Sequence, residues 1–292
     1  MIVDKVVLIT GCGGGIGKSL TKAFYTYGFR VYASSRSLDS INDLKEIGIN
    51  TLRMDVKDRL SIERAVNEVI EKEGKIDILI NNAGVSSFNT WIDIPDEELE
   101  DVIQTNFLGA VRTTKEVAKH MIKERTGLII NIGSVAGFLP MPISGLYCAS
   151  KASLHSFNDS LRVELSPFSI KVMLVMPGPI KTDIINKSLP NFKEILSNPE
   201  SPYYPIHKEL LDRPLTSIKN QVPVEGFTDS LMKSIFSSRI PNHFKYGPGS
   251  KFGLVFLSWL PTRLIDFIFS KKFGFSKLKS IIQKNGQNKK DN

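Results

Sequence analysis

The sequence is poor in cysteine and histidine, and this excludes several classes of protein. Its two cysteines, Cys12 and Cys148, cannot build the disulfide framework of a small secreted domain. The four histidines show no metal-binding spacing, so we expect no metal site. No apolar run follows a basic start at the N-terminus, so we expect no secretory signal and a cytoplasmic protein.

Net charge is also missing from most of the chain. The formal net charge is +8, yet residues 245–292 alone hold ten Lys/Arg and two acids, which leaves residues 1–244 neutral. Because the positive charge is confined to one end, we expect no nucleic-acid partner. The hydrophobic fraction of 41% in 292 residues is otherwise typical of a globular protein with a large core.

Short apolar runs alternate with segments of helical spacing over most of the chain. This alternation predicts βαβ units, a parallel sheet and helices on both of its faces. The predicted strands are 6–10, 30–34, 51–55, 76–80, 128–132, 171–176 and 243–246, and the predicted helices are 16–27, 38–47, 61–73, 96–123, 147–165 and 224–238.

Residues 177–223 break this alternation. They hold eight of the 15 prolines, so we expect an irregular segment. A long irregular segment inside a compact domain is usually a lid or a binding loop. We therefore predict a lid at about 183–222.

A glycine-rich turn follows the first predicted strand. Five of the seven residues from Gly11 to Gly17 are glycine, which lets the backbone turn tightly and approach a ligand closely. The helix that follows would present free N–H groups and its positive dipole end to that ligand. Between a strand and a helix, this turn predicts dinucleotide binding rather than a flexible loop.

Tyr147 and Lys151 stand four residues apart, so on a helix they share one face. The ammonium would favour the phenolate and lower the pKa of Tyr147, which predicts an acid/base near neutral pH. Ser134 follows a predicted strand, at the sheet edge where ligands bind, and would donate a hydrogen bond to a substrate carbonyl. A second pair, Tyr204 and Lys208, encloses Pro205 and is attributed to chance.

Together these motifs resemble the short-chain dehydrogenase/reductase superfamily. The matching motifs are Thr10–Gly17, Asn81–Gly84 and Pro177–Gly178, with Gly13–Gly14 where the family commonly has serine. The resemblance implies a single Rossmann-like, doubly wound parallel sheet in three α/β/α layers. It also implies hydride transfer between a nicotinamide and a carbonyl or alcohol carbon.

The resemblance also assigns roles to individual residues. Tyr147 would donate the proton, and Lys151 would bind ribose hydroxyls and tune Tyr147. Ser134 would orient the carbonyl, and Asn106, a poor helix former in mid-helix, would support a proton-relay water. The expected cofactor contacts are Gly11, Gly15, Ile16, Gly17, Ser35, Arg36, Asp55, Val56, Asn82, Ala83, Gly84, Tyr147, Lys151, Pro177, Gly178, Ile180 and Thr182.

The end of the second predicted strand indicates which nicotinamide cofactor binds. An acidic residue there would hold the ribose hydroxyls of NAD, and none is present. Ser35 and Arg36 instead offer a hydroxyl and a guanidinium, which suit a 2′-phosphate. We therefore expect NADP(H). Cys148, beside Tyr147, is interpreted as a small buried apolar residue.

The C-terminal segment combines apolar and basic residues. Residues 252–269 are strongly apolar but too interrupted to span a bilayer as one helix. They predict either an interfacial helix, with Lys271, Lys272, Lys277 and Lys279 facing anionic lipid, or a helix that covers the substrate cleft or a partner subunit. The predicted domains are a Rossmann-like catalytic domain over 1–250 and an apolar-basic extension over 251–292.

The extension resembles that of acyl-dihydroxyacetone-phosphate reductases and of related hydroxysteroid and retinol dehydrogenases. This resemblance implies an NADP(H)-dependent reductase of a lipophilic ketone, with an acyl-dihydroxyacetone phosphate as the specific substrate. Lys181, Lys187 or Lys193 would then meet the phosphate. The alternatives are a hydroxysteroid or retinol dehydrogenase and, in another class, a non-catalytic NADP-sensing or membrane-associated scaffold. The family also implies a homodimer or homotetramer.

Overall fold

The computed structural model describes residues 4–250 and 259–288, and its centre is a seven-stranded sheet. Every strand pair is parallel, in the order β3-β2-β1-β4-β5-β6-β7. The direction of winding reverses between β1 and β4, the position at which open α/β sheets bind ligands. The strands are β1 (Val6–Ile9), β2 (Arg30–Ser35), β3 (Asn50–Arg53), β4 (Ile78–Asn81), β5 (Gly127–Ile132), β6 (Ile170–Pro177) and β7 (His243–Tyr246).

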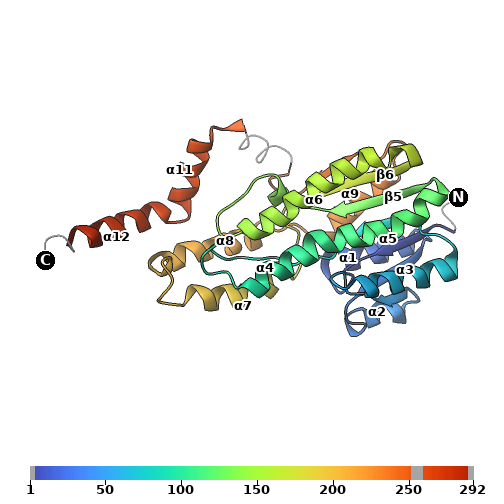
Figure 1. Ribbon diagram of the computed structural model, residues 1–292, viewed down its shortest axis with the longest axis horizontal. Helices are drawn as coiled ribbons and strands as arrows, with labels where there is room; N and C mark the ends of the chain where they lie inside the picture. Colours follow the sequence, from blue (N-terminus) through green and yellow to red (C-terminus); the bar gives the residue numbers. More distant parts are fainter. Residues whose placement is uncertain (1–3, 251–258, 289–292) are drawn as a thin grey trace.

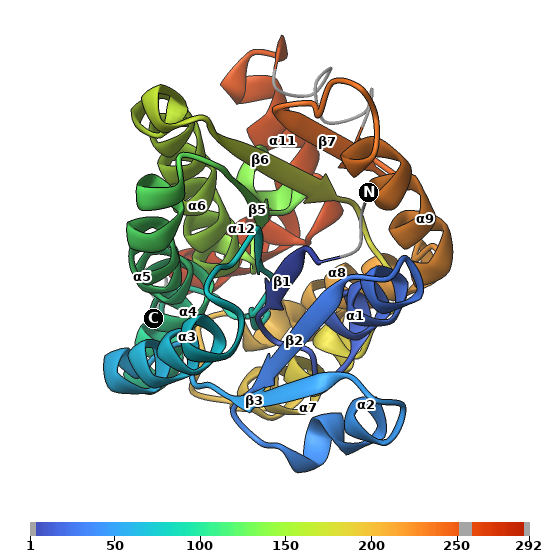
Figure 2. The ribbon, with the colours of Figure 1, turned by 90° about the vertical axis from the view of Figure 1, so that its right-hand side faces the viewer.

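Helices cover both faces of this sheet (Figure 2). Along β1, Val7 and Ile9 join the core under α1 and α9, whereas Val6 and Leu8 join the core under α3, α5 and α6. The three-layer Rossmann-like fold is thus confirmed. Its helices and short turns are α1 (Gly15–Thr26), η1 (Asp39–Ile41), α2 (Asn42–Glu46), α3 (Arg59–Glu73), α4 (Asp96–Ile103), η2 (Gln104–Leu108), α5 (Gly109–Glu124), η3 (Val135–Gly137), α6 (Gly145–Glu164), η4 (Ser166–Phe168) and α9 (Val224–Ile235).

The expectation of an irregular segment over 177–223 is wrong. Most of it folds as α7 (Ile184–Leu196), η5 (Tyr204–Ile206) and α8 (His207–Lys219), and Pro190 and Pro214 lie inside the two helices. Each proline removes a helical hydrogen bond. Burial of apolar side chains offsets that cost, since Phe192, Ile206 and Leu210 are completely buried.

The C-terminal helices extend from the end of the molecule opposite the N-terminus (Figure 1). α11 (Thr262–Lys272) has no buried residue, and α12 (Phe275–Asn288) packs against the rest of the protein through its first turn. Phe273 and Leu278 join a third core cluster with Phe192 of α7, Ile206 of η5 and Leu210 of α8. The start of the apolar segment, residues 252–258, lies outside the described residues.

Lys277, one of the four lysines of the interfacial-helix alternative, forms an ion pair within the protein: its Nζ lies 2.6 Å from Oε1 of Glu209 on α8. This ion pair and the shared core connect α12 to α8 and η5. In the part of the chain that the structure describes, no helix is both long and apolar enough to cross a bilayer.

Candidate active site

The glycine-rich turn between β1 and α1 is closed against the end of β4. Gly11 has a φ of +70°, and a Cβ there would lie 2.7 Å from the Cα of Ala83. Asn82 Nδ2 donates hydrogen bonds to the carbonyl oxygens of Thr10 (2.9 Å) and Gly11 (3.0 Å). These contacts fix the conformation of the turn. The N-terminus of α1 stays open to a ligand above the turn, as binding of a pyrophosphate requires.

The structure explains why position 13 is glycine, where the family commonly has serine. A Cβ at Gly13 would lie 2.9 Å from the Oγ of Ser40, which itself hydrogen-bonds to Ser35 at 2.8 Å. At Gly14, by contrast, a Cβ would meet nothing within 4 Å. The loop after β2 therefore takes the space that a serine side chain at position 13 would need.

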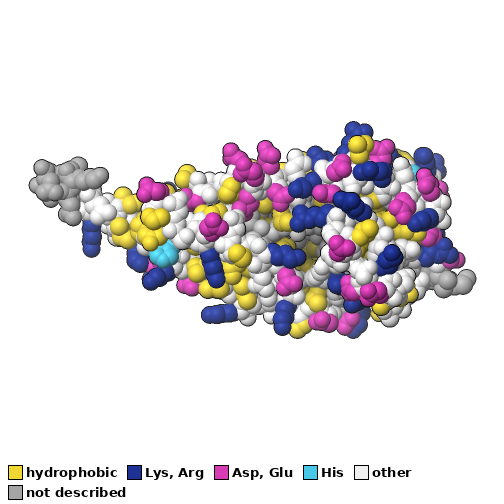
Figure 3. All heavy atoms as spheres, turned by 90° about the horizontal axis from the view of Figure 1, so that it is seen from below, with side chains coloured by type: hydrophobic (Ala, Val, Ile, Leu, Met, Phe, Trp, Pro, Cys, Tyr) yellow, Lys and Arg dark blue, Asp and Glu magenta, His cyan; other side chains and the backbone are white. Residues whose placement is uncertain are grey.

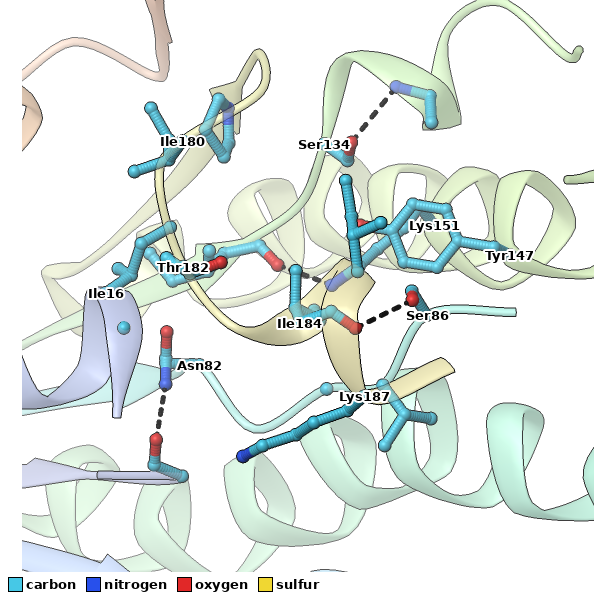
Figure 4. Close-up of a pocket in the computed structure, with 18 of the residues that line it drawn as sticks. Ile16, Asn82, Ser86, Ser134, Tyr147, Lys151, Ile180, Thr182, Ile184 and Lys187 are labelled. Carbon is cyan, nitrogen blue, oxygen red and sulfur yellow. Dashed lines mark hydrogen bonds between the residues drawn. The ribbon is translucent and has the colours of Figure 1, made fainter. Parts of the chain in front are cut away.

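A cavity of about 600 Å³ runs along the carboxyl edge of the sheet (Figure 4). Gly11, Ser35, Asn82 and Pro177 line it from the ends of four different strands. Tyr147 and Lys151 line it from α6. The structure thus brings all the predicted site residues to this cavity, with the exception of Gly17 and Asn106, which lie behind its wall.

Gly17 is buried beneath the glycine-rich turn. A Cβ at this position would contact Asn82 Nδ2 and would lie 2.5 Å from the Gly11 carbonyl oxygen. The glycine therefore permits α1 to approach the turn closely and does not itself face the cavity.

Asn106 lies in η2, a π-helical turn between α4 and α5. Its Nδ2 donates to the Val85 carbonyl (2.9 Å) and to Ser150 Oγ (3.0 Å), and its Oδ1 accepts from the Val85 N–H (2.8 Å). These hydrogen bonds are all to protein groups, and through them the Asn106 side chain links α6 to the segment after β4.

Lys151 is buried under Tyr147. Its Nζ donates to the Ile132 carbonyl at 2.8 Å and lies 6.0 Å from the centroid of the Tyr147 ring. Burial lowers the pKa of Lys151 to about 8. Its ammonium is therefore less firmly protonated than that of a surface lysine.

The expected lowering of the Tyr147 pKa is not found in the protein alone. Burial raises the pKa of Tyr147, and the Ser134 hydroxyl opposes the shift. Desolvation of the phenolate therefore outweighs the neighbouring donors. The Ser134 Oγ accepts from the Ala136 N–H at 3.1 Å, which leaves its own proton free to donate.

The end of β2 carries basic side chains. Ser35 and Arg36 line the main cavity, and Arg36 also lines a second one with Arg53 and Arg64. Asp55 also lines both cavities, and its Oδ1 accepts from the Lys57 N–H at 2.9 Å. The guanidinium groups favour an anion such as a phosphate.

The sequence reasoning missed the wall formed by α7 and α8. Of the three proposed lysines, only Lys187 lines the cavity. Arg213 on α8 lines it too and was not predicted, because the segment was expected to be irregular. Helical spacing of Arg213 with Thr216, Ser217 and Asn220 was the signal that could have revealed it. Tyr204 and Lys208 lie outside the cavity.

A parallel sheet with a glycine-rich first turn and a Tyr–Lys pair in one cavity defines a nucleotide-dependent oxidoreductase. A sequence model of the family "short chain dehydrogenase" matches residues 5–192. The chain therefore belongs to the short-chain dehydrogenase family.

The two cysteines, Cys12 and Cys148, are buried and free, and burial raises the pKa of both thiols.

Individual relatives agree with this assignment. An NADPH-dependent 1-acyldihydroxyacetone phosphate reductase of Schizosaccharomyces pombe is 35% identical over 79% of this chain and 78% of its own. The Saccharomyces cerevisiae protein of the same name is 28% identical over 98% and 97%. Among solved structures, a serine dehydrogenase complexed with NADP+ is 26% identical, with a TM-score of 0.72 over 83% of this chain and 94% of that one.

Proposed function

We propose that this protein is an NADPH-dependent reductase of a 1-acyldihydroxyacetone phosphate. The observation that carries the proposal is that Ser134, Tyr147 and Lys151 meet in one cavity with Arg36 at its cofactor end. Two relatives that align over most of the chain carry this activity in their names.

The residues present fit an NADP(H) cofactor. Gly11 and Gly15 both have positive φ, and a Cβ at Gly15 would lie 2.9 Å from Thr182 Cγ2, so the cradle has no room for side chains. Gly11, Gly15 and Ile16 would hold the pyrophosphate, and Ser35 and Arg36 the 2′-phosphate. Bound there, the nicotinamide supplies the hydride for reduction of the ketone.

The chain itself would bind and protonate the carbonyl oxygen. Ser134 Oγ has a free proton with which to orient that oxygen, and Tyr147 donates the proton that completes the alcohol. Lys151, held by the Ile132 carbonyl, binds the ribose hydroxyls and favours the charged form of Tyr147. Asn106 would support the proton-relay water from behind Gly84, where a Cβ would lie 3.3 Å from Asn106 Oδ1. Both Nδ2 protons are already donated to Val85 and Ser150, so only Oδ1 is left for this role.

Apolar side chains make the other end of the cavity suitable for a lipid. Ile184 and Ile185 line it from the lid, and Phe88 and Met141 from the catalytic body. We assign residues 1–250 to the catalytic domain, including the lid at 183–222, and residues 251–292 to an appended extension that closes on the lid through α12.

The test is NADPH oxidation by the purified protein with a long-chain 1-acyldihydroxyacetone phosphate, and with a steroid ketone and a retinal for comparison. Tyr147→Phe should lower kcat by about 10²- to 10⁴-fold, because it removes the acid, while NADPH still binds. Turnover of the steroid or retinal alone would replace the proposed substrate. Retention of the cellular role by Tyr147→Phe would instead favour an NADP-sensing scaffold.

We also propose that α11 and the residues before it attach the protein to the surface of an intracellular or cytoplasmic membrane. Trp259, which precedes α11, and Phe267 on α11 are 85% and 62% exposed, and Arg263, Lys271 and Lys272 flank Phe267. On the face that Figure 3 draws, hydrophobic and basic side chains also lie side by side on the part of the chain next to the C-terminus. Aromatic side chains of this kind enter the headgroup boundary while the bases meet anionic lipid.

Co-sedimentation with vesicles tests this attachment. Binding to vesicles with anionic lipid should exceed binding to zwitterionic vesicles, and Phe267→Ser should weaken it. Binding that persists after deletion of residues 251–292 would refute the proposal.

The family resemblance also leads us to propose a homodimer or homotetramer that forms through α5 and α6. On α6, Val163 is 64% exposed. Light scattering measures the oligomeric state.

A further inference from the structure

Arg213 is a charged side chain in the cavity wall that the proposed reaction does not use. Its Nη1 donates to Ser217 Oγ, whereas its Nε is buried without a hydrogen-bond partner. Among residues 4–250 and 259–288, no carboxylate forms an ion pair with it. A largely desolvated guanidinium without an anion is costly, so this arrangement favours a ligand that supplies one.

The side chains around Arg213 form a polar stripe on α8. Arg213, Thr216, Ser217 and Asn220 all line the cavity and follow the i, i+3, i+4, i+7 spacing of one helical face. Arg213 and Ser217 are half-buried, and Thr216 and Asn220 are exposed at the open side of the cavity. The stripe offers a guanidinium, two hydroxyls and an amide, which are donors suited to phosphate oxygens.

The stripe lies on the substrate side of the cavity. Burial lowers the pKa of Arg213, and the neighbouring Cys148 and Tyr147 act in the opposite direction, so Arg213 lies near the proposed proton donor. The other bases are occupied elsewhere: Lys151 Nζ donates to the Ile132 carbonyl. In Figure 4 the ammonium of Lys187 points toward the Asn82 side, away from Tyr147.

We propose that Arg213, supported by Ser217, binds the phosphate group of the substrate and thereby selects phosphorylated ketolipids over neutral ones. The inference rests on the proposed function for the position of the reacting ketone. The planar guanidinium can hold two phosphate oxygens at once, which a lysine at this position cannot do.

The kinetic test compares 1-acyldihydroxyacetone phosphate with the same ketone lacking its phosphate. Arg213→Gln should lower kcat/KM for the phosphorylated ketone by about 10- to 100-fold, the usual weight of a charged hydrogen bond. It should change kcat/KM for the neutral ketone and the Kd of NADPH by less than about 3-fold. Arg213→Lys should restore part of the loss. Lys193→Ala, an exposed base outside the cavity, is the matched control and should change neither substrate.

A binding experiment separates this inference from the choice of substrate. Calorimetry on the protein–NADP+ complex measures 1-acylglycerol 3-phosphate against 1-acylglycerol, with thermal unfolding to confirm that the variant is folded. If the wild type does not reduce the phosphorylated ketone but Arg213→Gln selectively weakens the phosphorylated ligand, the substrate is wrong and the phosphate site stands. Three results would overturn the inference. They are an equal loss of affinity for both ligands in Arg213→Gln, a selective loss of NADPH affinity in this variant, and no preference of the wild type for the phosphorylated ligand.

Discussion

The two halves of the cavity are built by different means. The cofactor half is made of strand ends and backbone, fixed by contacts such as Asn82 Nδ2 with the Thr10 and Gly11 carbonyls. The substrate half is made of α7 and α8, which share a separate core cluster with Phe273 and Leu278 of the C-terminal segment. The proposed nucleotide site is thus formed by the sheet, whereas the proposed substrate site depends on helices that come late in the chain.

The largest effect is expected from a change in the core cluster that holds the substrate half in place. Phe273→Ala should lower the free energy of unfolding by about 3–5 kcal/mol, because the ring is 2% exposed and lies in the third core cluster. KM for the lipid ketone should rise while the Kd of NADPH stays constant. Denaturant titration and steady-state kinetics measure both effects.

Phe267→Ala is the matched control on α11, where the side chain is 62% exposed. It should change the free energy of unfolding by less than about 0.5 kcal/mol. An equal loss of NADPH affinity and substrate affinity in Phe273→Ala would show that the two halves are not independent.

The converse change acts on the cofactor half. Gly11→Ala should weaken NADPH binding by about 100-fold, since the positive φ alone costs about 1–2 kcal/mol and the new Cβ would displace the backbone at Ala83. Gly14→Ala is the control, because its Cβ meets nothing within 4 Å. Fluorescence titration with NADPH checks both variants, and equal affinities would refute the described turn.

A smaller effect is expected at the outer end of the cofactor half. Arg36→Ala should lower NADPH affinity by about 10- to 100-fold and leave NADH affinity unchanged, because it removes a charged donor to the 2′-phosphate. Arg59→Ala removes an exposed arginine outside both cavities and should not alter this preference. A parallel loss for NADPH and NADH would show that Arg36 does not read the phosphate.

The last effect concerns Lys151, where the two halves meet. Its pKa is lowered from 10.5 to about 8 by burial, so above pH 8 the unfolded chain holds a proton that the folded protein has lost. Between pH 8 and 10.5, the cofactor-free protein should therefore gain stability relative to Lys151→Met, by about 1.4 kcal/mol per pH unit at most. Urea titrations at several pH values measure the difference. A difference that falls as pH rises would contradict the lowered pKa.

The sequence predicted the strands well because buried parallel strands leave a simple signal. Runs such as Val6–Ile9 are apolar, β-branched and bounded by turn residues, which few other structures satisfy. Most of the proposed site follows from the same signal, since residues directly after such strands must meet at one edge of the sheet. The structure confirms that convergence, while the chemical roles of the residues stay predictions.

The sequence misled where tertiary packing overrides local preference. Pro190 and Pro214 predicted irregular structure, yet burial of Phe192 and Leu210 holds both segments helical. The pKa of Tyr147 was misjudged for a related reason. The charge of a neighbour four residues away is visible in the sequence, but the desolvation that outweighs it is not.

The sequence by itself determined the parallel sheet, the glycine-rich turn and the alignment of Tyr147 with Lys151, because each depends on short-range periodicity or on residues without side chains. Only the tertiary structure decided what forms the substrate wall. Arg213 enters the cavity from α8, which packs against α7 and is connected to the C-terminal segment by the third core cluster and the Lys277–Glu209 ion pair. Contacts between segments so far apart leave no periodic signal, since burial is a property of the assembled core.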